Sequence, residues 1–415
     1  MPAPTEAADT ILIFPPQSEF ALQAPHLALP QLVAYLRSRG VASDYVDLNI
    51  RFYRFLASAE ILTRQMDRLV QHREALHRRP SLSDAELTQL LELSRIEGLR
   101  TGAATLGDPS RLRHMDALLR CRFLFAPLME NLPKGFEATL DWVSKGRESV
   151  ITAYYAQLDL AHWVGARSLV GISVAFHIQL YPALELARRI RALRGGRTKV
   201  VLGGSQLSLM TAPQKRALAR LPYVDAVVAH EGELPLLRIC EQLDESTGVD
   251  FSKVPNVYYQ SAGGTVPSPR FDLPVAIGDL PTPEFNAEEL TLYLKPVSLP
   301  VHVSKGCYWG KCKFCDYTRL YTPGQAKASN RPLEKLLADI QGLTRRHGIA
   351  SFLLISEAIP PAYYRSLSER LIEMDLDLEF WSYCRVEKSY DFHFFQTLYR
   401  AGVRRLTFGV EATTD

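Results

Sequence analysis

Three cysteines lie close together in the sequence, at Cys307, Cys312 and Cys315. Three thiolates on one short loop can hold three corners of a [4Fe-4S] cube. Because no fourth cysteine follows nearby, the fourth iron would stay open to a substrate. Gly306 and Gly310 would let the backbone wrap closely around such a cluster. The spacing therefore indicates a metal-binding loop.

A zinc site is the alternative for the same loop. Three cysteines and one histidine form a common zinc ligand set, and His302 could supply the histidine. The other three cysteines, Cys121, Cys240 and Cys384, are scattered along the chain. This pattern is typical of a metal site rather than a disulfide framework, and we expect a reducing, cytoplasmic setting.

Composition excludes several classes of protein. The 415 residues are 47% apolar, which is enough for two or three cores, and the net charge is only +3. Lys and Arg are interspersed with Asp and Glu, so we expect no nucleic-acid binding. No apolar run reaches the roughly 18 residues that a membrane span needs, and the amino terminus lacks the basic region of a secretory signal.

Strands and helices alternate after residue 296. The pattern predicts strands at 301–304, 351–356, 378–384 and 406–410, separated by helices, which is typical of part of a (β/α) barrel. Barrel enzymes place their chemistry at the carboxyl ends of the strands. Besides the cysteines, the groups at these ends are Glu357, Arg385 and Glu411.

The amino-terminal half predicts a second α/β unit. Five apolar strands alternate with helices, as in a doubly wound parallel sheet. They are predicted at 10–14, in a segment that ends at 47, and at 169–174, 199–202 and 224–228. Residues 51–160 show helical spacing and a capping box at Ser83–Glu86, so we expect a helical insertion there. Residues 251–295 are rich in Pro, Gly and Ser and are predicted to be a linker.

Ligands of a doubly wound sheet bind beyond the carboxyl ends of its strands. Small and polar residues at these ends could contact a large flat ligand. A dinucleotide-binding fold would need Gly-x-Gly-x-x-Gly after the first strand, where Pro15-Pro16 stands instead. The candidate ligand-binding residues are Pro16, Asn49, Ser173, Val174, Gly203, Gly204, Ser205, Glu231 and Gly232.

The cysteine loop resembles that of the radical S-adenosylmethionine superfamily, whose motif is Cys-x3-Cys-x2-Cys with an aromatic residue before the last cysteine. Phe314 matches that residue, whereas four residues separate Cys307 from Cys312. Similar extended gaps occur in peptide-maturation branches. The resemblance implies that the open iron chelates S-adenosylmethionine. It places Phe314 near the adenine, and Glu357, Arg385 and Glu411 near the methionine and ribose.

Residues 10–50 and 165–245 resemble the cobalamin-binding domain that precedes the radical core in one class of this superfamily. The resemblance rests on Pro25–Pro30, Val200–Gly204 and Glu231–Glu233. It implies a Rossmann-like cobalamin-binding domain at 1–250, a linker at 251–295 and a radical core at 296–415.

Other cobalamin proteins supply an axial histidine from Asp-x-His-x-x-Gly. The nearest matches, at 159–165 and 391–396, depart from this motif, so we expect no histidine ligand from it. His177, at a strand end, stays open as a ligand.

By resemblance, the expected reaction is methylation of an unactivated carbon in a peptide or small-molecule natural product. Flavodoxin or ferredoxin would be the electron donor. Radical rearrangement, ring contraction or cyclisation is an enzymatic alternative, and a non-catalytic cobalamin- or cluster-binding partner protein is another. Only four strands fit after residue 296, against about six in the superfamily, so we expect a truncated barrel or one completed by a partner.

Overall fold

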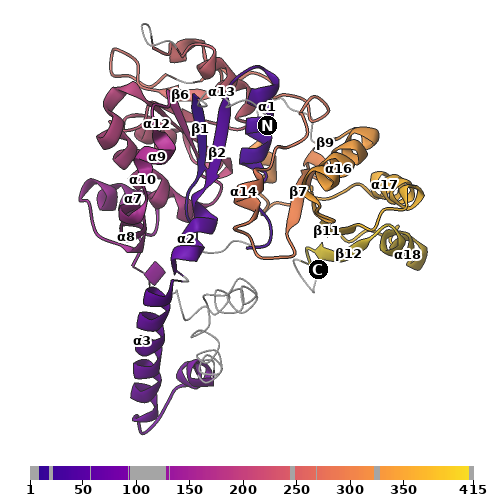
Figure 1. Cartoon of the computed structure of the whole chain (residues 1–415), viewed down its shortest axis with the longest axis horizontal. Coiled ribbons are helices and arrows are strands. Elements are labelled where there is room, and N and C mark those ends of the chain that lie inside the picture. Colours follow the sequence, from indigo (N-terminus) through magenta and orange to yellow (C-terminus); the bar gives the residue numbers. More distant parts are fainter. Residues whose placement is uncertain are drawn as a thin grey trace.

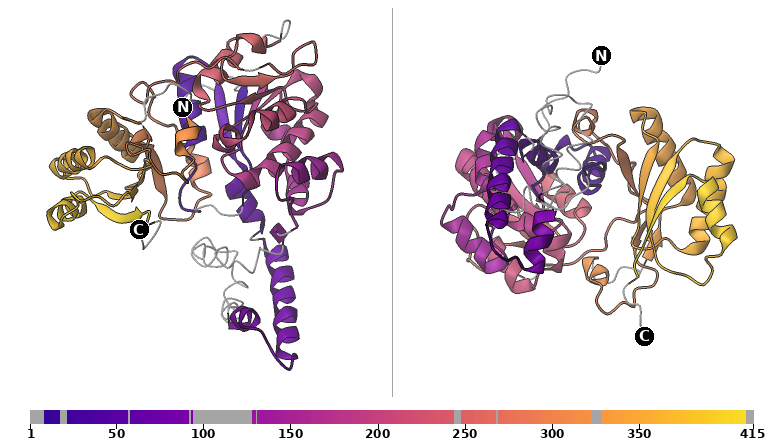
Figure 2. Two further views of the ribbon diagram at one scale, coloured as in Figure 1. Left: turned by 180° about the vertical axis from the view of Figure 1, so that it is seen from behind. Right: turned by 90° about the horizontal axis from the view of Figure 1, so that it is seen from below.

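The computed structural model describes residues 9–17, 22–56, 58–91, 93, 128–129, 131–243, 248–267, 269–321 and 328–410. Two mainly parallel sheets lie side by side, each with its own helices (Figures 1 and 2). None of the helices in these ranges combines the length and apolar character needed to cross a bilayer.

The first sheet has six strands. Their order is β2 (Ser43–Asp47), β1 (Thr10–Phe14), β3 (Leu169–Ser173), β4 (Lys199–Gly203), β5 (Ala226–Val228) and β6 (Val257–Tyr259). The first five are parallel, as predicted, and β6 is antiparallel to β5. Since β1 lies between β2 and β3, the chain winds outwards in both directions from β1.

Helices cover both faces of this sheet. Leu12 and Phe14 of β1 belong to one apolar cluster, with residues of α1 (Ala28–Ser38) and α13 (Glu233–Cys240). Ile11 and Ile13 belong to the other, with residues of α10 (Leu180–Arg194) and α12 (Ala212–Ala219). Burial on both faces explains why the strands are almost continuously apolar.

The described part of residues 51–160 is helical. It contains most of α2 (Leu48–Leu56) together with α3 (Ala59–His77), α7 (Phe136–Ser144), α8 (Val150–Gln157) and α9 (Leu160–Val164). Helix α3 projects away from the two sheets (Figure 1). The predicted capping box is present, since the Ser83 amide donates to Glu86 at 2.9 Å and the Glu86 amide donates to the Ser83 hydroxyl at 3.4 Å.

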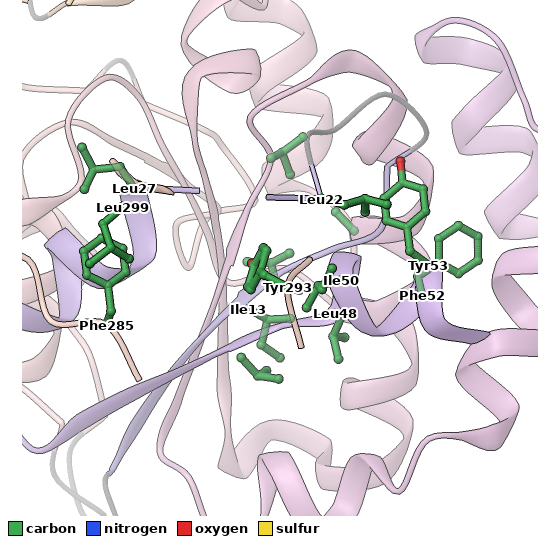
Figure 3. Packing of buried hydrophobic residues seen from close by; sticks show 14 of the residues in the cluster. Ile13, Leu22, Leu27, Leu48, Ile50, Phe52, Tyr53, Phe285, Tyr293 and Leu299 are labelled. Carbon is green, nitrogen blue, oxygen red and sulfur yellow. The ribbon is translucent and has the colours of Figure 1, made fainter. Parts of the chain in front are cut away.

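The predicted linker also contributes structure. It contains β6 and α14 (Ala287–Leu290). Strand β6 fits the short strand-like pieces visible in the sequence of this segment, whereas α14 was not predicted, because four residues are too few to show a period. The Tyr293 hydroxyl donates to the buried Asp47 carboxylate at the end of β2. Figure 3 shows Tyr293 and Phe285 among core residues of β1, α2 and the second sheet, so this segment packs into a shared core.

The second sheet has four parallel strands in the order β7 (Ser298–His302), β10 (Ser351–Ile355), β11 (Glu379–Cys384) and β12 (Val403–Phe408). Helices α16 (Leu333–His347), α17 (Pro361–Met374) and α18 (Phe392–Arg400) lie along one side (Figure 2). These elements show the predicted alternation of four parallel strands with helices.

The strand predicted at 301–304 is wrong in its bounds. Strand β7 begins earlier, at Ser298, and ends at His302. It begins earlier because Pro300 is accommodated inside the parallel strand rather than preceding it. A separate strand, β8 (Ser304–Gly306), then pairs with β9 (Ala328–Asn330) in an antiparallel ribbon. The cysteine loop therefore follows the ribbon strand β8 rather than the barrel strand directly.

Candidate functional site

A cavity of about 700 Å³ lies between the two sheets. One wall is the carboxyl edge of the six-stranded sheet. The opposite wall consists of alternate residues of the four-stranded sheet, which share one face because side chains in a strand alternate between its two sides. These residues are Pro300, His302, Leu353, Ile355, Trp381 and Tyr383.

Six of the nine predicted ligand-binding residues at the sheet edge line this cavity: Ser173, Gly203, Gly204, Ser205, Glu231 and Gly232. Gly204 has a positive φ of 107°, and a Cβ there would lie 2.4 Å from the carbonyl oxygen of Val174. A side chain at 204 is thus excluded by the neighbouring strand connection itself. Gly203 is different, since the nearest neighbour of its Cβ would be Val228 Cβ at an ordinary 3.6 Å.

The other three residues lie behind this edge, in contacts within the protein. The Asn49 side-chain oxygen accepts a hydrogen bond from the Gln17 amide at 2.8 Å. The Val174 amide donates to the Gly203 carbonyl at 2.7 Å, and Pro16 is buried. These residues shape the strand ends and do not line the cavity. His177 is exposed in the short helix η2 (His177–Gln179) and is also outside the cavity lining.

The cysteine loop lies beside the barrel end of the cavity. Cys307 and Cys315 are half-buried and Cys312 is exposed, while Gly306 and Gly310 have positive φ values of 79° and 57°. Within the described ranges, no three His, Cys, Asp or Glu side chains converge as finished metal ligands. The three thiols would therefore have to turn towards one another to hold a cluster.

Side chains from the end of β11 hold this loop in place. The Arg385 guanidinium stacks on the Trp309 ring, with its central carbon 3.6 Å from the ring centroid. It also donates to Glu387, which accepts a hydrogen bond from the Tyr308 hydroxyl at 2.5 Å. Arg385, predicted near the methionine and ribose, thus contacts the cysteine loop itself.

Glu357 is connected to the cysteine loop through two tyrosines. The Tyr321 hydroxyl donates to one carboxylate oxygen of Glu357, and the other oxygen is buried with no hydrogen-bond partner among the described residues. Burial raises the pKa of Glu357. Burial also raises the pKa of Tyr317, with further contributions from its neighbours Glu357, Cys315, Tyr383 and Cys307. Glu357 and two of the cysteines are therefore electrostatic neighbours of one tyrosine that lines the cavity.

Phe314 does not join this group. Phe314 is 67% exposed and lies outside the cavity lining. Glu411 lies outside the described residues.

A buried ion pair crosses between the two walls. The Lys305 ammonium lies 3.2 Å from the Glu233 carboxylate, and both side chains are almost fully buried. Lys305 belongs to β8, and Glu233 follows Gly232 at the start of α13. This pair joins the cysteine loop to the edge of the six-stranded sheet.

The sequence did not indicate several residues of the cavity wall. Lys305 and Tyr321 were not predicted as site residues, His302 was considered only as a zinc ligand, and His26 was named only as part of the Pro25–Pro30 motif. His26 lies face to face with Phe14 and accepts a hydrogen bond from the Ala28 amide at 3.3 Å. Alternation along β7, which puts His302 on the same side of the strand as Pro300, is a sequence signal that could have placed His302 on this wall.

Comparison with known proteins identifies the fold. No family model matches the chain. Among curated proteins, an anaerobic magnesium-protoporphyrin IX monomethyl ester cyclase from Rubrivivax gelatinosus is 27% identical over 226 residues, which are 52% of this chain and 39% of the cyclase.

Solved structures of two enzymes, among others, match almost the whole chain. The cobalamin-dependent S-adenosylmethionine radical enzyme OxsB, with aqua-cobalamin and S-adenosylmethionine bound, matches 98% of this chain and 44% of its own with a TM-score of 0.57 and 15% identity. The second is the radical S-adenosylmethionine methyltransferase TsrM from Kitasatospora setae, with cobalamin and a [4Fe-4S] cluster bound. It matches 98% of this chain and 62% of its own, with a TM-score of 0.55 and 15% identity. The chain spans less than two thirds of each of these proteins.

Proposed function

We propose that this chain, which has the fold of cobalamin-dependent radical S-adenosylmethionine enzymes, binds a [4Fe-4S] cluster, S-adenosylmethionine and cobalamin, and methylates an unactivated carbon of a peptide or small-molecule substrate. One observation carries the proposal. A single cavity is lined both by the glycine-containing edge of a doubly wound sheet and by the residues that surround the cysteine loop.

The residues present fit both bound groups. Three thiols on one loop are the donor set of a cluster with one open iron. At the opposite wall, Gly203 and Gly232 present backbone rather than side chains, so a flat ring can approach closely. When bound, the cluster would supply the electron that cleaves S-adenosylmethionine, and cobalamin would supply the methyl group.

The chain's own groups bind and orient the reactants. Cys307, Cys312 and Cys315 would hold the iron, and the Glu357 carboxylate, which accepts a hydrogen bond from the Tyr321 hydroxyl, could accept further hydrogen bonds from the methionine amino group. The Lys305–Glu233 pair closes the wall between the two sheets, which keeps water from a reactive intermediate. Flavodoxin or ferredoxin delivers the electron.

Anaerobic reconstitution tests the proposal. The chain is incubated with iron, sulfide and hydroxocobalamin, desalted, and then given S-adenosylmethionine and a reductant. We expect about four iron atoms and one corrinoid per chain. We also expect 5′-deoxyadenosine and S-adenosylhomocysteine, the second because the reductant would bring the corrinoid to the Co(I) state that can accept a methyl cation from S-adenosylmethionine. Stoichiometric zinc that survives reconstitution, or tight nicotinamide dinucleotide binding without corrinoid uptake, would contradict the proposal.

Cyclisation is the second candidate reaction, because the curated relative is named as a cyclase. The two reactions differ in their by-products. Methylation consumes S-adenosylmethionine both as a radical source and as a methyl donor, whereas ring closure needs no methyl transfer. Formation of 5′-deoxyadenosine with no S-adenosylhomocysteine would therefore favour cyclisation.

A further inference from the structure

The segment that carries the cysteines contributes to two different surfaces. Tyr317 and Tyr321, which follow the third cysteine, line the cavity. Lys311, Cys312 and Lys313 are exposed to solvent and lie outside the cavity lining. The cavity surface is where S-adenosylmethionine would bind, so the surface around Cys312 stays open to a second molecule.

This outer surface carries positive charge that the protein does not neutralise. Lys311 and Lys313 stand on either side of Cys312 in the chain, and neither forms an ion pair with a described residue. The acidic residue that follows the third cysteine, Asp316, already pairs with Arg319 at 3.0 Å. The outer surface of the loop therefore has two uncompensated cations.

Aromatic side chains accompany these two lysines. The Lys311 ammonium lies 4.7 Å from the centroid of the Trp309 ring, on which the Arg385 guanidinium also stacks. Phe314, next to Lys313 in the chain, is 67% exposed. An exposed aromatic residue with charged residues around it has the layout of a protein contact site, in which a charged rim surrounds an apolar centre.

The proposed reaction requires an electron from outside the chain. Each cleavage of S-adenosylmethionine takes one electron from the cluster, which must then be reduced again. Electron transfer slows steeply with distance, so a donor protein must approach the cluster where its ligands are least covered. Of the three cysteines, Cys312 is exposed, whereas Cys307 and Cys315 are half-buried.

We infer that Lys311, Lys313 and Phe314 form the docking surface for an acidic one-electron donor protein. Carboxylates of the donor face the two lysines, and its redox group lies near Cys312. The donor loses one electron and the cluster gains it, with no bond formed or broken. The inference rests on the proposed function, since it requires a reducible cluster on this loop.

Affinity for an acidic flavodoxin tests the inference. Calorimetric titration of the cluster-loaded full chain with oxidised flavodoxin should show that Lys311→Glu combined with Lys313→Glu weakens binding about tenfold at low ionic strength. The difference should shrink to about twofold at about 0.5 M salt, because exposed charges are then screened. Lys311→Arg combined with Lys313→Arg keeps both charges and should stay within about twofold of the wild type.

A matched control separates this surface from the overall charge of the chain. Lys134→Glu combined with Lys145→Glu makes the same change in net charge at exposed residues of the helical region, and flavodoxin affinity should not change. Iron content should be equal in the wild type and the Lys311→Glu, Lys313→Glu variant. So should the electron paramagnetic resonance signal of the cluster after photoreduction with deazaflavin, a small uncharged reductant.

Equal flavodoxin affinity of the wild type and the Lys311→Glu, Lys313→Glu variant would overturn the inference, as would the same loss of affinity in the control variant. Both outcomes leave the proposed function intact. A wild type in which deazaflavin reduces no cluster would instead contradict the proposed function itself.

Discussion

The two walls of the cavity are built differently. The edge of the six-stranded sheet is determined by the backbone: the Val174 amide bonds to Gly203, and Gly204 occupies a conformation that its neighbours leave no room to change. The cysteine loop is held by side chains, chiefly the contact of Arg385 with Trp309, and its Cys312 is exposed.

This difference separates a preformed site from one that its ligand completes. A rigid, flat ligand binds best to a wall that does not move, because little conformational entropy is lost. Metal ligands are different, since binding of the metal can supply the free energy that arranges them. We therefore expect changes in the loop to affect the cluster alone, whereas changes at the sheet edge affect folding and corrinoid binding together.

Removal of one cysteine should have the largest effect. Cys312→Ala leaves two thiolates, so iron content after reconstitution should fall from about four per chain to near zero. Cobalamin uptake, measured by absorbance on the same sample, should persist. Cys240→Ala is the control, because Cys240 hydrogen-bonds Thr10 far from the loop and should not affect iron. Loss of both cofactors in Cys312→Ala would show that the walls are not independent.

Breaking the ion pair between the walls should have the next largest effect. Lys305→Met leaves the buried Glu233 carboxylate without its partner, which costs about 3–5 kcal/mol of folding free energy. Denaturant unfolding measures this loss. The double variant with Glu233→Leu removes both charges and should recover much of the stability. Lys145→Met, which breaks an exposed pair with Asp141, should cost far less folding free energy than Lys305→Met. A similar loss of folding free energy in Lys305→Met and Lys145→Met would show that the buried pair does not hold the two walls together.

The contrast between a wall shaped by local backbone and a loop held by distant side chains also explains what the sequence could predict. The three cysteines and Gly203-Gly204-Ser205 are local patterns, and strand periodicity placed them at strand ends. Lys305 meets Glu233 across 72 residues, and Tyr321 meets Glu357 across 36, so no local pattern could reveal either contact. Strands β8 and β9 have three residues each, too few for a period. Asn49 and Val174 were predicted to bind the ligand only because they follow strand ends. They do not line the cavity, whereas Ser173 does, and the direction of a side chain at a strand end cannot be read from position alone.

Gly204→Leu should have an intermediate effect. The substitution forces a positive φ on a branched residue and drives its Cβ into Val174, so we expect a loss of about 3 kcal/mol and reduced cobalamin uptake. The cause would be strain in the protein rather than overlap with the ligand. Gly203→Ala meets only an ordinary contact and should keep the fold while weakening cobalamin binding by a few fold. If Gly204→Leu folds with wild-type stability and loses only cobalamin, direct contact with the ligand is the better explanation.

The smallest effect should come from the aromatic contact that holds the loop. Trp309→Leu removes the Arg385 cation–π interaction, worth about 1 kcal/mol, while Glu387 still pairs with Arg385. Because the loop is completed by its metal, this loss should act on the cluster: iron release to a chelator should be a few fold faster, with cobalamin affinity unchanged. Trp142→Leu is the matched control, since it removes a similar contact with Arg147 in the helical region. That control should lower the melting temperature slightly without speeding iron release, because nothing in α7 holds the cysteines. Equal rates of iron release in both variants would mean that the metal, and not Trp309, fixes the loop.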